Sequence, residues 1–145
     1  MALIRDIMSK VVISIRPEHT LMDAVKVLTK HHISGAPVVT RQGTVVGFIS
    51  EQNLMDVLFD KEARTACVTD VMSLEVHTVE SQDTISAAAK LFSMYGVRRL
   101  PVLENGRFVG VITRRDLLAH MLHDSELLSD PLLELIPALG EFTCA

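Results

Sequence analysis

Cysteine is scarce in this sequence, which has 145 residues and two cysteines, Cys67 and Cys144. Their separation matches neither the spacing of a zinc site nor the dense pattern of a disulfide-stabilised secreted domain. This cysteine usage is typical of a protein in a reducing compartment. We therefore expect a cytoplasmic protein.

Positive charge is also in short supply, because 14 lysines and arginines are set against 18 aspartates and glutamates. The formal net charge at pH 7 is −4. A protein that binds a long phosphate backbone needs a concentrated basic field. We therefore expect no nucleic-acid polymer as a partner.

Long hydrophobic runs are absent as well. No apolar run approaches the length that crosses a membrane, and Arg5 and Asp6 interrupt the apolar stretch near the N-terminus, which does not resemble a secretion signal. We expect no membrane partner. The hydrophobic share of 48% nevertheless supplies a core for one compact domain, or for two small halves that share one.

The sequence is an internal duplication. Val-Met-Ser at 71–73 repeats Ile-Met-Ser at 7–9, and the match extends to residues 110–113 against residues 47–50. One extra residue near Gln42 in the first copy restores the register. Such a repeat predicts two supersecondary units, each of which buries an apolar face against the other. The cleft between the two copies is then the place to look for a functional site.

Both copies show the same order of hydrophobic periods. Residues 21–28 and 85–92 carry apolar side chains at the spacing of an amphipathic helix, and Thr20 with Asp23 forms a near capping box before the first. Asn105-Gly106 predicts a two-residue hairpin turn, and a slightly longer turn is expected at 41–43. The expected strands are residues 11–15, 36–39 and 44–49 in the first copy and 76–79, 100–103 and 108–112 in the second.

A second helix ends each copy, so the predicted fold class is α/β (α+β), with two repeated β-α-β-β-α units packed with pseudo-two-fold symmetry. The expected domains are a first repeat at 4–59, a charged linker at 60–69, a second repeat at 70–123 and an apolar tail at 124–145. A short helix is expected in the tail between Pro131 and Pro137. The tail would cover its own core or contact another subunit, and both alternatives remain open.

The end of the last strand in the second copy carries the candidate chemistry. Thr113 supplies a hydroxyl and Asp116 a carboxylate where the last helix starts, and the free amides of a helix start favour a phosphate. Asp116, as a pair of acceptors, suits the two hydroxyls of a ribose. The same two residues also have the form of an N-cap with an acid at N3, which needs no ligand. On spacing alone, the cap is the more ordinary explanation.

An asymmetry between the copies favours a ligand. The second copy has five arginines where the first has Ser34, Gly35, Thr44, Glu51 and Gln52: these are Arg98, Arg99, Arg107, Arg114 and Arg115. A duplication that served the fold alone would not need this difference. Arg98 and Arg99 immediately precede a strand, where a planar guanidinium would bind a phosphate in the cleft through paired hydrogen bonds. Either arginine taken alone is as readily a solvated surface side chain.

Residues from about 4 to 122 resemble a tandem pair of cystathionine-beta-synthase-type (CBS) domains, the regulatory unit called a Bateman module. The likeness rests on the Asp-Ile-Met and Asp-Val-Met openings at 6–8 and 70–72, the Pro-Val strands, and the Gly-x-x-Ser/Thr-x-x-Asp/Asn endings. The resemblance implies two clefts that bind adenosine compounds such as AMP, ADP, ATP or S-adenosylmethionine. It also implies a disc-like homodimer that changes shape when the ligand binds.

The resemblance also implies roles for individual residues. It places the phosphate-side hydroxyl at Thr113, the ribose carboxylate at Asp116, a sugar or base contact at Thr78, and a phosphate-binding residue for either cleft at Arg99. In the first copy Ser50 keeps the hydroxyl, whereas Asn53 replaces the carboxylate and loses a charge-assisted pair. We therefore expect one good site and one weakened or empty site. The predicted nucleotide-binding residues are Thr113, Asp116, Thr78, Arg99, Arg98, Ser50 and Asn53.

The remaining polar residues predict neither a metal site nor catalysis. His31 and His32 lie at a helix end that favours a basic group, and His120 with His123 has no evident third ligand. We find no nucleophile beside a base, no paired acids and no redox motif. We therefore expect no enzymatic activity, and a hydrolase or transferase acting on the nucleotide is the least favoured alternative.

Together these observations predict a regulatory sensor that binds an adenine nucleotide (AMP, ADP or ATP) between its two repeats and needs no obligatory cofactor. We expect it to form a homodimer and to signal to a separate target protein, which the sequence does not identify. The alternative is a ligand-free dimerisation or scaffold module with the same fold.

Overall fold

The computed structural model describes residues 2–123. The predicted tail helix therefore lies outside the described residues. In chain order the elements are α1 (Ile4–Ile7), α2 (Leu21–His31), β1 (Gly35–Val39), β2 (Val45–Ser50), α3 (Glu51–Met55), the short 3₁₀ helices η1 (Ala63–Thr65) and η2 (Val68–Asp70), β3 (Val79–Glu80), α4 (Ile85–Tyr95), β4 (Arg99–Glu104), β5 (Arg107–Thr113) and α5 (Arg114–His123).

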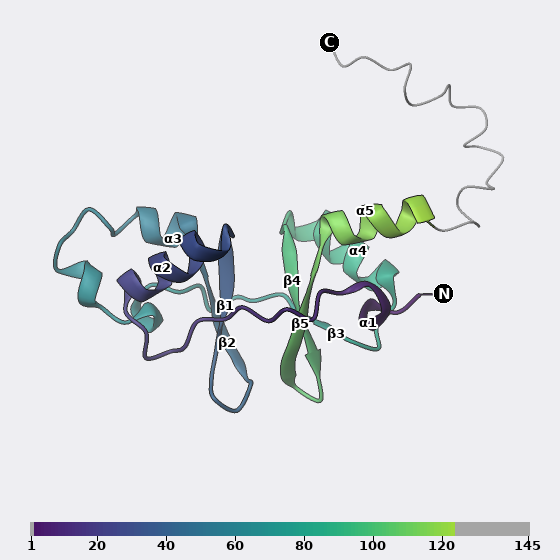
Figure 1. The fold of residues 1–145 in the computed structure, drawn as a ribbon, viewed down its shortest axis with the longest axis horizontal. Coiled ribbons are helices and arrows are strands. Elements are labelled where there is room, and N and C mark those ends of the chain that lie inside the picture. Colours follow the sequence, from purple (N-terminus) through teal and green to yellow (C-terminus); the bar gives the residue numbers. More distant parts are fainter. Residues whose placement is uncertain (1, 124–145) are drawn as a thin grey trace, which may run out of the picture.

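The elements form two similar units that lie side by side (Figure 1). In the first unit β1 and β2 form an antiparallel hairpin, and in the second β4 pairs with β3 in parallel and with β5 antiparallel. Each unit adds two helices, so the predicted α+β class with repeated β-α-β-β-α units is confirmed. None of the helices within residues 2–123 is long and apolar enough to cross a membrane.

The first predicted strand, residues 11–15, is wrong in extent. It is reduced to one parallel bridge between Ile15 and Val38. The segment before it is bridged to β5 through Ser9 and Val111, so the residues between the two bridges cross from one unit to the other. A segment that crosses between sheets has no single strand to pair with, and Val11 is accordingly 70% exposed.

The predicted turns are confirmed. Asn105 and Gly106 have φ values of 53° and 79°, which are the two positive angles that a type I′ hairpin turn needs. In the longer turn of the first unit Gly43 has φ of 88°. The two hairpins also touch, because the backbone N–H of Phe108 donates to the carbonyl of Gly43 at 2.9 Å.

The opening segment of each copy docks on the opposite unit. Ile4 is fully buried in the core of the second unit, and Val68, inside the predicted linker, is fully buried in the core of the first. Isolated bridges fix this exchange in matched pairs: Leu3 with Thr84, Ser9 with Val111, Thr20 with Cys67 and Phe48 with Ser73. The domain limits predicted from the repeat stay a prediction, but each core needs residues from both copies.

Two glycines let the exchanged segments approach the strands closely. A Cβ at Gly110 would lie 2.6 Å from the carbonyl oxygen of Ser9, and a Cβ at Gly47 would collide with Sδ of Met72. These two positions correspond in the two copies. A Cβ at either position would therefore clash with the segment that crosses from the opposite copy, with its backbone at Gly110 and with a side chain at Gly47.

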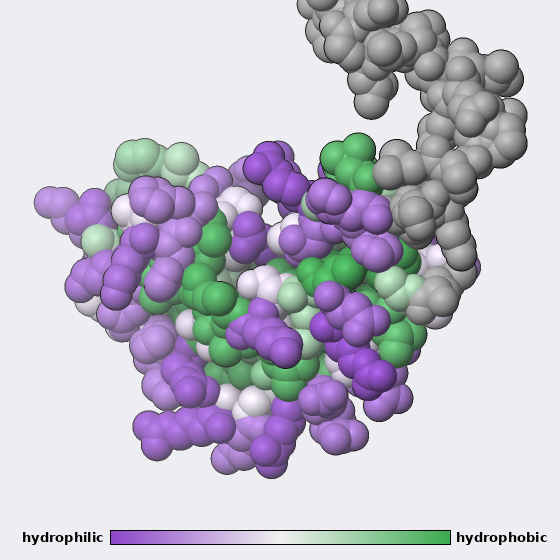
Figure 2. All heavy atoms as spheres, turned by 45° about the vertical axis from the view of Figure 1, so that its right-hand side comes forward, coloured by the Kyte–Doolittle hydropathy of each residue, from purple (hydrophilic) through white to green (hydrophobic). Residues whose placement is uncertain are grey.

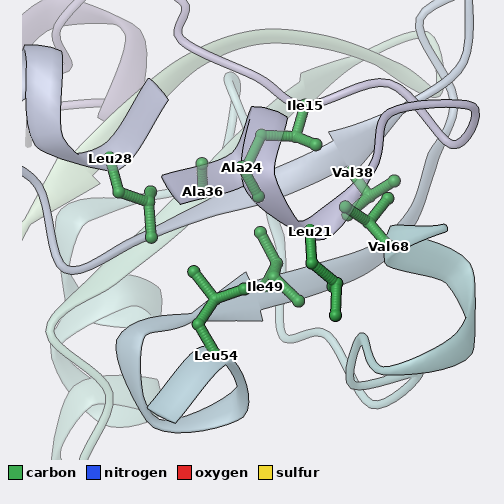
Figure 3. Packing of buried hydrophobic residues seen from close by; sticks show 9 residues of the cluster. All are labelled: Ile15, Leu21, Ala24, Leu28, Ala36, Val38, Ile49, Leu54 and Val68. Carbon is green, nitrogen blue, oxygen red and sulfur yellow. The ribbon is translucent and has the colours of Figure 1, made fainter. Parts of the chain in front are cut away.

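The core of the first unit is built from the predicted apolar stripe of α2 and from β1. Leu21, Ala24 and Leu28 pack from α2 against Ala36 and Val38 of β1 (Figure 3). All five residues of β1 are buried. The predicted capping box begins this helix, because the N–H of Asp23 donates to Oγ1 of Thr20 at 3.2 Å and the N–H of Thr20 donates back to Asp23 at 3.0 Å. Buried hydrophobic residues of the second core are Ile4, Val79, Ala88, Phe92, Leu100, Val102 and Ile112.

Candidate functional site

Both helices that follow a hairpin begin with a reciprocal cap. The backbone N–H of Thr113 donates to Oδ2 of Asp116 at 2.8 Å, and the N–H of Asp116 donates to Oγ1 of Thr113 at 3.1 Å. The structure therefore confirms the N-cap interpretation of Thr113 and Asp116. The cap engages one oxygen of the carboxylate, and the two carboxylate oxygens together offer about four acceptor positions.

The first unit has the same cap with an amide. Oδ1 of Asn53 accepts from both the backbone N–H and the hydroxyl of Ser50, at 2.9 and 2.8 Å. The N–H of Asn53 donates to Oγ of Ser50 at 3.2 Å. Because Oδ1 is already used twice, the Nδ2 group of Asn53 supplies the remaining hydrogen-bonding capacity of this side chain, and it only donates.

A cleft of about 390 Å³ lies between the two units. Its wall contains Ser50 and Asn53 from the first unit and Arg98 and Arg99 from the second. The structure thus brings together four of the seven predicted residues in a volume typical of small-molecule sites, which are roughly 300–1,000 Å³. Thr113 and Asp116 do not line this cleft.

Thr78 is the third predicted residue that does not line the cleft, although its neighbours Val76 and His77 do. By the correspondence between the copies, Thr113 and Asp116 match Ser50 and Asn53. They therefore occupy in the second unit the positions that Ser50 and Asn53 occupy in the first. The roles assigned to the seven residues from the sequence stay predictions.

Arg99 is a cleft residue with an unpaired hydrogen-bond donor. Within residues 2–123, its Nε is the buried side-chain nitrogen that has no hydrogen-bond partner. Burial lowers the pKa of the Arg99 guanidinium, because the charged form loses water around it. A buried donor on a cation costs free energy while it has no acceptor.

Arg114, the first residue of α5, is hydrogen-bonded to the segment that carries Arg98. Its guanidinium donates to the carbonyl of Gly96 at 2.6 Å and to that of Val97 at 2.7 Å, and its backbone N–H donates to the carbonyl of Arg98 at 3.3 Å. These bonds satisfy carbonyls at the end of α4. Arg114 is thus a fixed support for the segment that presents Arg98 and Arg99.

The sequence prediction missed an aromatic pair at the cleft. The rings of His77 and Tyr95 stack with centroids 3.8 Å apart and planes inclined by 16°. His77 lines the cleft, and its Nε2 lies 3.7 Å from Oε1 of Glu75. A lone histidine before a strand gives no sequence signal of this kind, because its partner Tyr95 arrives from the end of α4. Of the pair only His77 lines the cleft, and an aromatic ring is a group on which a planar base can stack.

A larger hollow of about 730 Å³ adjoins the cleft and shares Ser50 and Arg98 with it. Its wall comes from α2, α3 and the residues that follow them, and it combines aliphatic side chains such as Leu28 and Leu54 with polar ones such as Thr29, Glu51 and Gln52. Asn53, His77 and Arg99 line the smaller cleft and do not line this hollow. We therefore assign the ligand chemistry to the smaller cleft.

Neither a cluster of ionisable side chains nor a metal-ligand spacing adds another site within residues 2–123. In that part of the chain no three His, Cys, Asp or Glu side chains are grouped so that they could hold a metal ion.

Comparisons with known proteins agree with the repeat. A family model for the CBS domain matches residues 4–60 and 68–123. The uncharacterized protein MJ1426 of Methanocaldococcus jannaschii is 29% identical over 83% of this chain and 91% of that protein. Inosine-5'-monophosphate dehydrogenase of the same organism is 32% identical over 78% of this chain, but this match spans 22% of the enzyme.

A solved structure shows the same arrangement of two units. The CBS domain pair of protein MJ0100, crystallised in complex with 5-methylthioadenosine and S-adenosyl-L-methionine, superposes with a TM-score of 0.72. It is 27% identical in sequence, and the match covers 85% of this chain and 98% of that one.

Proposed function

The chain belongs to the CBS domain family, and we propose that it is a regulatory module that binds an adenosine-containing ligand between its units and signals occupancy to a partner protein. The observation that carries the proposal is that Arg98 and Arg99 lie together in the wall of a cleft of suitable volume. The related pair of MJ0100 with its two adenosyl compounds supports the ligand class.

The cleft offers a place for each part of such a ligand. His77, backed by Tyr95, presents an aromatic face for the base. Arg98 and Arg99 supply cationic donors for a phosphate, and Ser50 with Asn53 supplies polar groups between them. In the matching half of the junction we keep Thr113, Asp116 and Thr78 as candidates for a second ligand site.

Regulation follows if the ligand binds one conformation of the module better than another. At a free ligand concentration of about 100 times Kd, one-site binding stabilises the competent state by about 2.7 kcal/mol. This is enough to shift a balanced equilibrium between two conformations almost completely. The module would then act on a separate protein rather than perform chemistry itself, and incubation with nucleotide should yield no product.

Thermal unfolding and calorimetry with adenosine, AMP, ADP, ATP, 5-methylthioadenosine and S-adenosylmethionine test the proposal. At least one compound should raise Tm and release or absorb heat with a stoichiometric endpoint. Arg99→Gln should weaken binding of that compound, whereas Arg107→Gln, which removes the same charge from an exposed position on β5, should not. If no compound binds the wild-type protein, the proposed function is wrong.

The alternative, a ligand-free dimerisation module, is favoured by exposed apolar side chains on the helices. Met55 at the end of α3 is 61% exposed, and Leu118 and Leu122 on α5 are 62% and 61% exposed. Hydrophobic atoms also reach the surface along the upper edge and across the middle of the face shown in Figure 2. Surfaces of this kind mark contacts between proteins, and we propose a homodimer.

Sedimentation equilibrium tests the homodimer, and the binding measurements then separate the scaffold from the sensor. A dimer that dissociates on Leu118→Glu, while Leu74→Glu at another exposed apolar position leaves it intact, places the contact on α5. A dimer that binds no adenosine compound would support the scaffold function. A monomer at micromolar concentration would exclude the homodimer.

A further inference from the structure

We propose that the larger hollow, which α2 and α3 line beside the cleft, is the docking site for residues 131–137 of the same chain, with Glu134 placed against Arg98. These residues belong to the apolar tail and lie outside the described part of the chain. Such docking does not depend on the proposed ligand. It decides between the two roles that the sequence left open for the tail.

The aliphatic part of the hollow is the surface that an occupant would cover. Leu28 and Leu54 belong to the core of the first unit, where they are 5% and 4% exposed, and both also line the hollow. Met55, which lines it as well, is 61% exposed. An opening of about 730 Å³ leaves this apolar surface in contact with water. An occupant with leucine-sized side chains would remove it from water, which is favourable.

The wall of the hollow also contains one arginine, Arg98, whose side chain is exposed. Among residues 2–123 no carboxylate lies at ion-pair distance from Arg98, and this includes Glu51, which lines the same hollow. An occupant that combines aliphatic side chains with a single acidic group would therefore match this surface.

Residues 131–137 have that composition. Their sequence is Pro-Leu-Leu-Glu-Leu-Ile-Pro, so Glu134 is the one charged residue beside four aliphatic ones. From residue 124 onward the tail holds five of the 18 acidic residues and none of the 14 lysines and arginines. The first 123 residues thus carry 14 basic and 13 acidic residues, and the net charge of −4 arises in the tail. Attraction between opposite charges favours the tail on the body of its own chain.

The tail is long enough to reach the hollow of its own chain. α5 begins beside the wall, because the backbone N–H of Arg114 donates to the carbonyl of Arg98 at 3.3 Å. α5 has 10 residues, so the tail starts about 15 Å from there. Residues 124–133 span up to about 33 Å when extended, which lets Glu134 return to Arg98. The exposed apolar side chains of α5 do not line the hollow, so they remain available to the proposed homodimer.

A docked tail would act on the neighbouring cleft, because the hollow and the cleft share Ser50 and Arg98. The carboxylate of Glu134 would compete with an anionic ligand for the guanidinium of Arg98. This consequence rests on the proposed function. The docking itself does not, and it is tested without ligand.

Paramagnetic broadening in NMR spectra of the full chain measures the docking directly. A spin label is attached to Ala138→Cys, immediately after the docking segment, in a chain whose two native cysteines are replaced by serine. The methyl signals of Leu28 and Leu54 should broaden. The methyl signals of Ile4 should broaden less, because α1 lies on the far side of the second unit from α3 (Figure 1).

Matched variants separate specific docking from a loose association of the tail. Leu133→Asp should abolish the broadening of Leu28 and Leu54, because it places a charge among apolar side chains. Glu134→Gln should reduce it less, since an ion pair with an exposed arginine contributes little beside apolar burial. Leu127→Asp and Glu141→Gln make the same changes outside the segment and should leave the broadening unchanged.

A mixed sample identifies the chain that supplies the tail. Spin-labelled chains without isotope are mixed with isotope-labelled chains that carry no spin label, so any broadening there comes from a second copy. Broadening that is confined to chains carrying both labels supports the proposal. Equal broadening in the mixed sample, equal broadening of Ile4 and Leu54, or broadening that survives Leu133→Asp would overturn it.

Discussion

Replacing Gly110 with alanine should destabilise the protein much more than the same replacement at Gly47. The two glycines occupy corresponding positions in β5 and β2, and each faces the crossing segment of the opposite copy. They differ in what a new Cβ meets. At position 110 it would lie 2.6 Å from the backbone oxygen of Ser9, whereas at position 47 its nearest neighbours are side-chain atoms of Met72.

The magnitudes follow from these contacts. The Ser9 carbonyl accepts from the N–H of Val111 at 3.0 Å, and the N–H of Ser9 donates to the carbonyl of Val111 at 2.9 Å. Displacing Ser9 would weaken both bonds at about 1 kcal/mol each. Overpacking adds about 1–3 kcal/mol, and the stiffer unfolded chain returns about 0.4–1 kcal/mol. Gly110→Ala should therefore cost about 2–4 kcal/mol.

The cost at Gly47 should be about 1 kcal/mol or less. Met72 is an unbranched side chain that can move its sulfur away without displacing the backbone. The bridge between Phe48 and Ser73, with hydrogen bonds of 2.9 and 2.8 Å, would then survive. The similarity of the two positions in sequence makes this contrast a direct test of the close approach.

Urea unfolding followed by circular dichroism measures both costs from the shift in midpoint at constant slope. The Gly47→Ala/Met72→Ala double variant should cost less than the sum of its single variants, because removing the thioether relieves the collision. Met8→Ala should give no comparable relief to Gly110→Ala, since the obstacle there is backbone. Equal costs at positions 47 and 110 would refute this reasoning.

Three further predictions follow from the packing and the caps. Leu100→Ala, in the fully buried core of the second unit, should lower the free energy of unfolding by about 2–5 kcal/mol in the same urea assay, and a cost below 1 kcal/mol would contradict its placement. Arg114→Gln should raise the Kd of any ligand held by Arg99, because the carbonyls of Gly96 and Val97 lose their support; an unchanged Kd in calorimetry would show that the wall holds its shape without it. The pKa of Asp23 is lowered from 3.8, first by the backbone hydrogen bond from Thr20, so its stabilisation is present at neutral pH and is lost as pH falls below that value. Asp23→Asn should therefore reduce stability at pH 7 and make the acid limb of the stability curve shallower, and an unaltered acid limb would argue against the cap as its cause.

The sequence predicted local features well where the cause lies within a few residues. Thr20 and Asp23 are three positions apart and form their cap in the structure, as expected. Asn105 and Gly106 adopt the two positive φ angles that their types favour. The order of elements followed from repetition, because the second copy confirms the interpretation of the first.

The exchange of the opening segments was not predictable, because it depends on contacts between distant residues. Residues 11–15 have the composition of a strand, yet the partner that would pair with them lies partly in each unit. The composition of the cleft wall also depends on contacts between residues that are distant in the sequence. Arg99 was predicted as a phosphate-binding residue for either cleft, and only the folded chain shows that it shares a wall with Ser50 and Asn53 rather than with Asp116.

The burial of Ile4 in the core of the second unit has a mechanical consequence. A pulling force applied to the first residues would not unfold the first unit from its end. It would first extract Ile4 from the core of the second unit and open that core, while the first unit stayed folded around Val68. Any protein or surface tethered to this end would thus be coupled to the half of the molecule that carries Arg98 and Arg99.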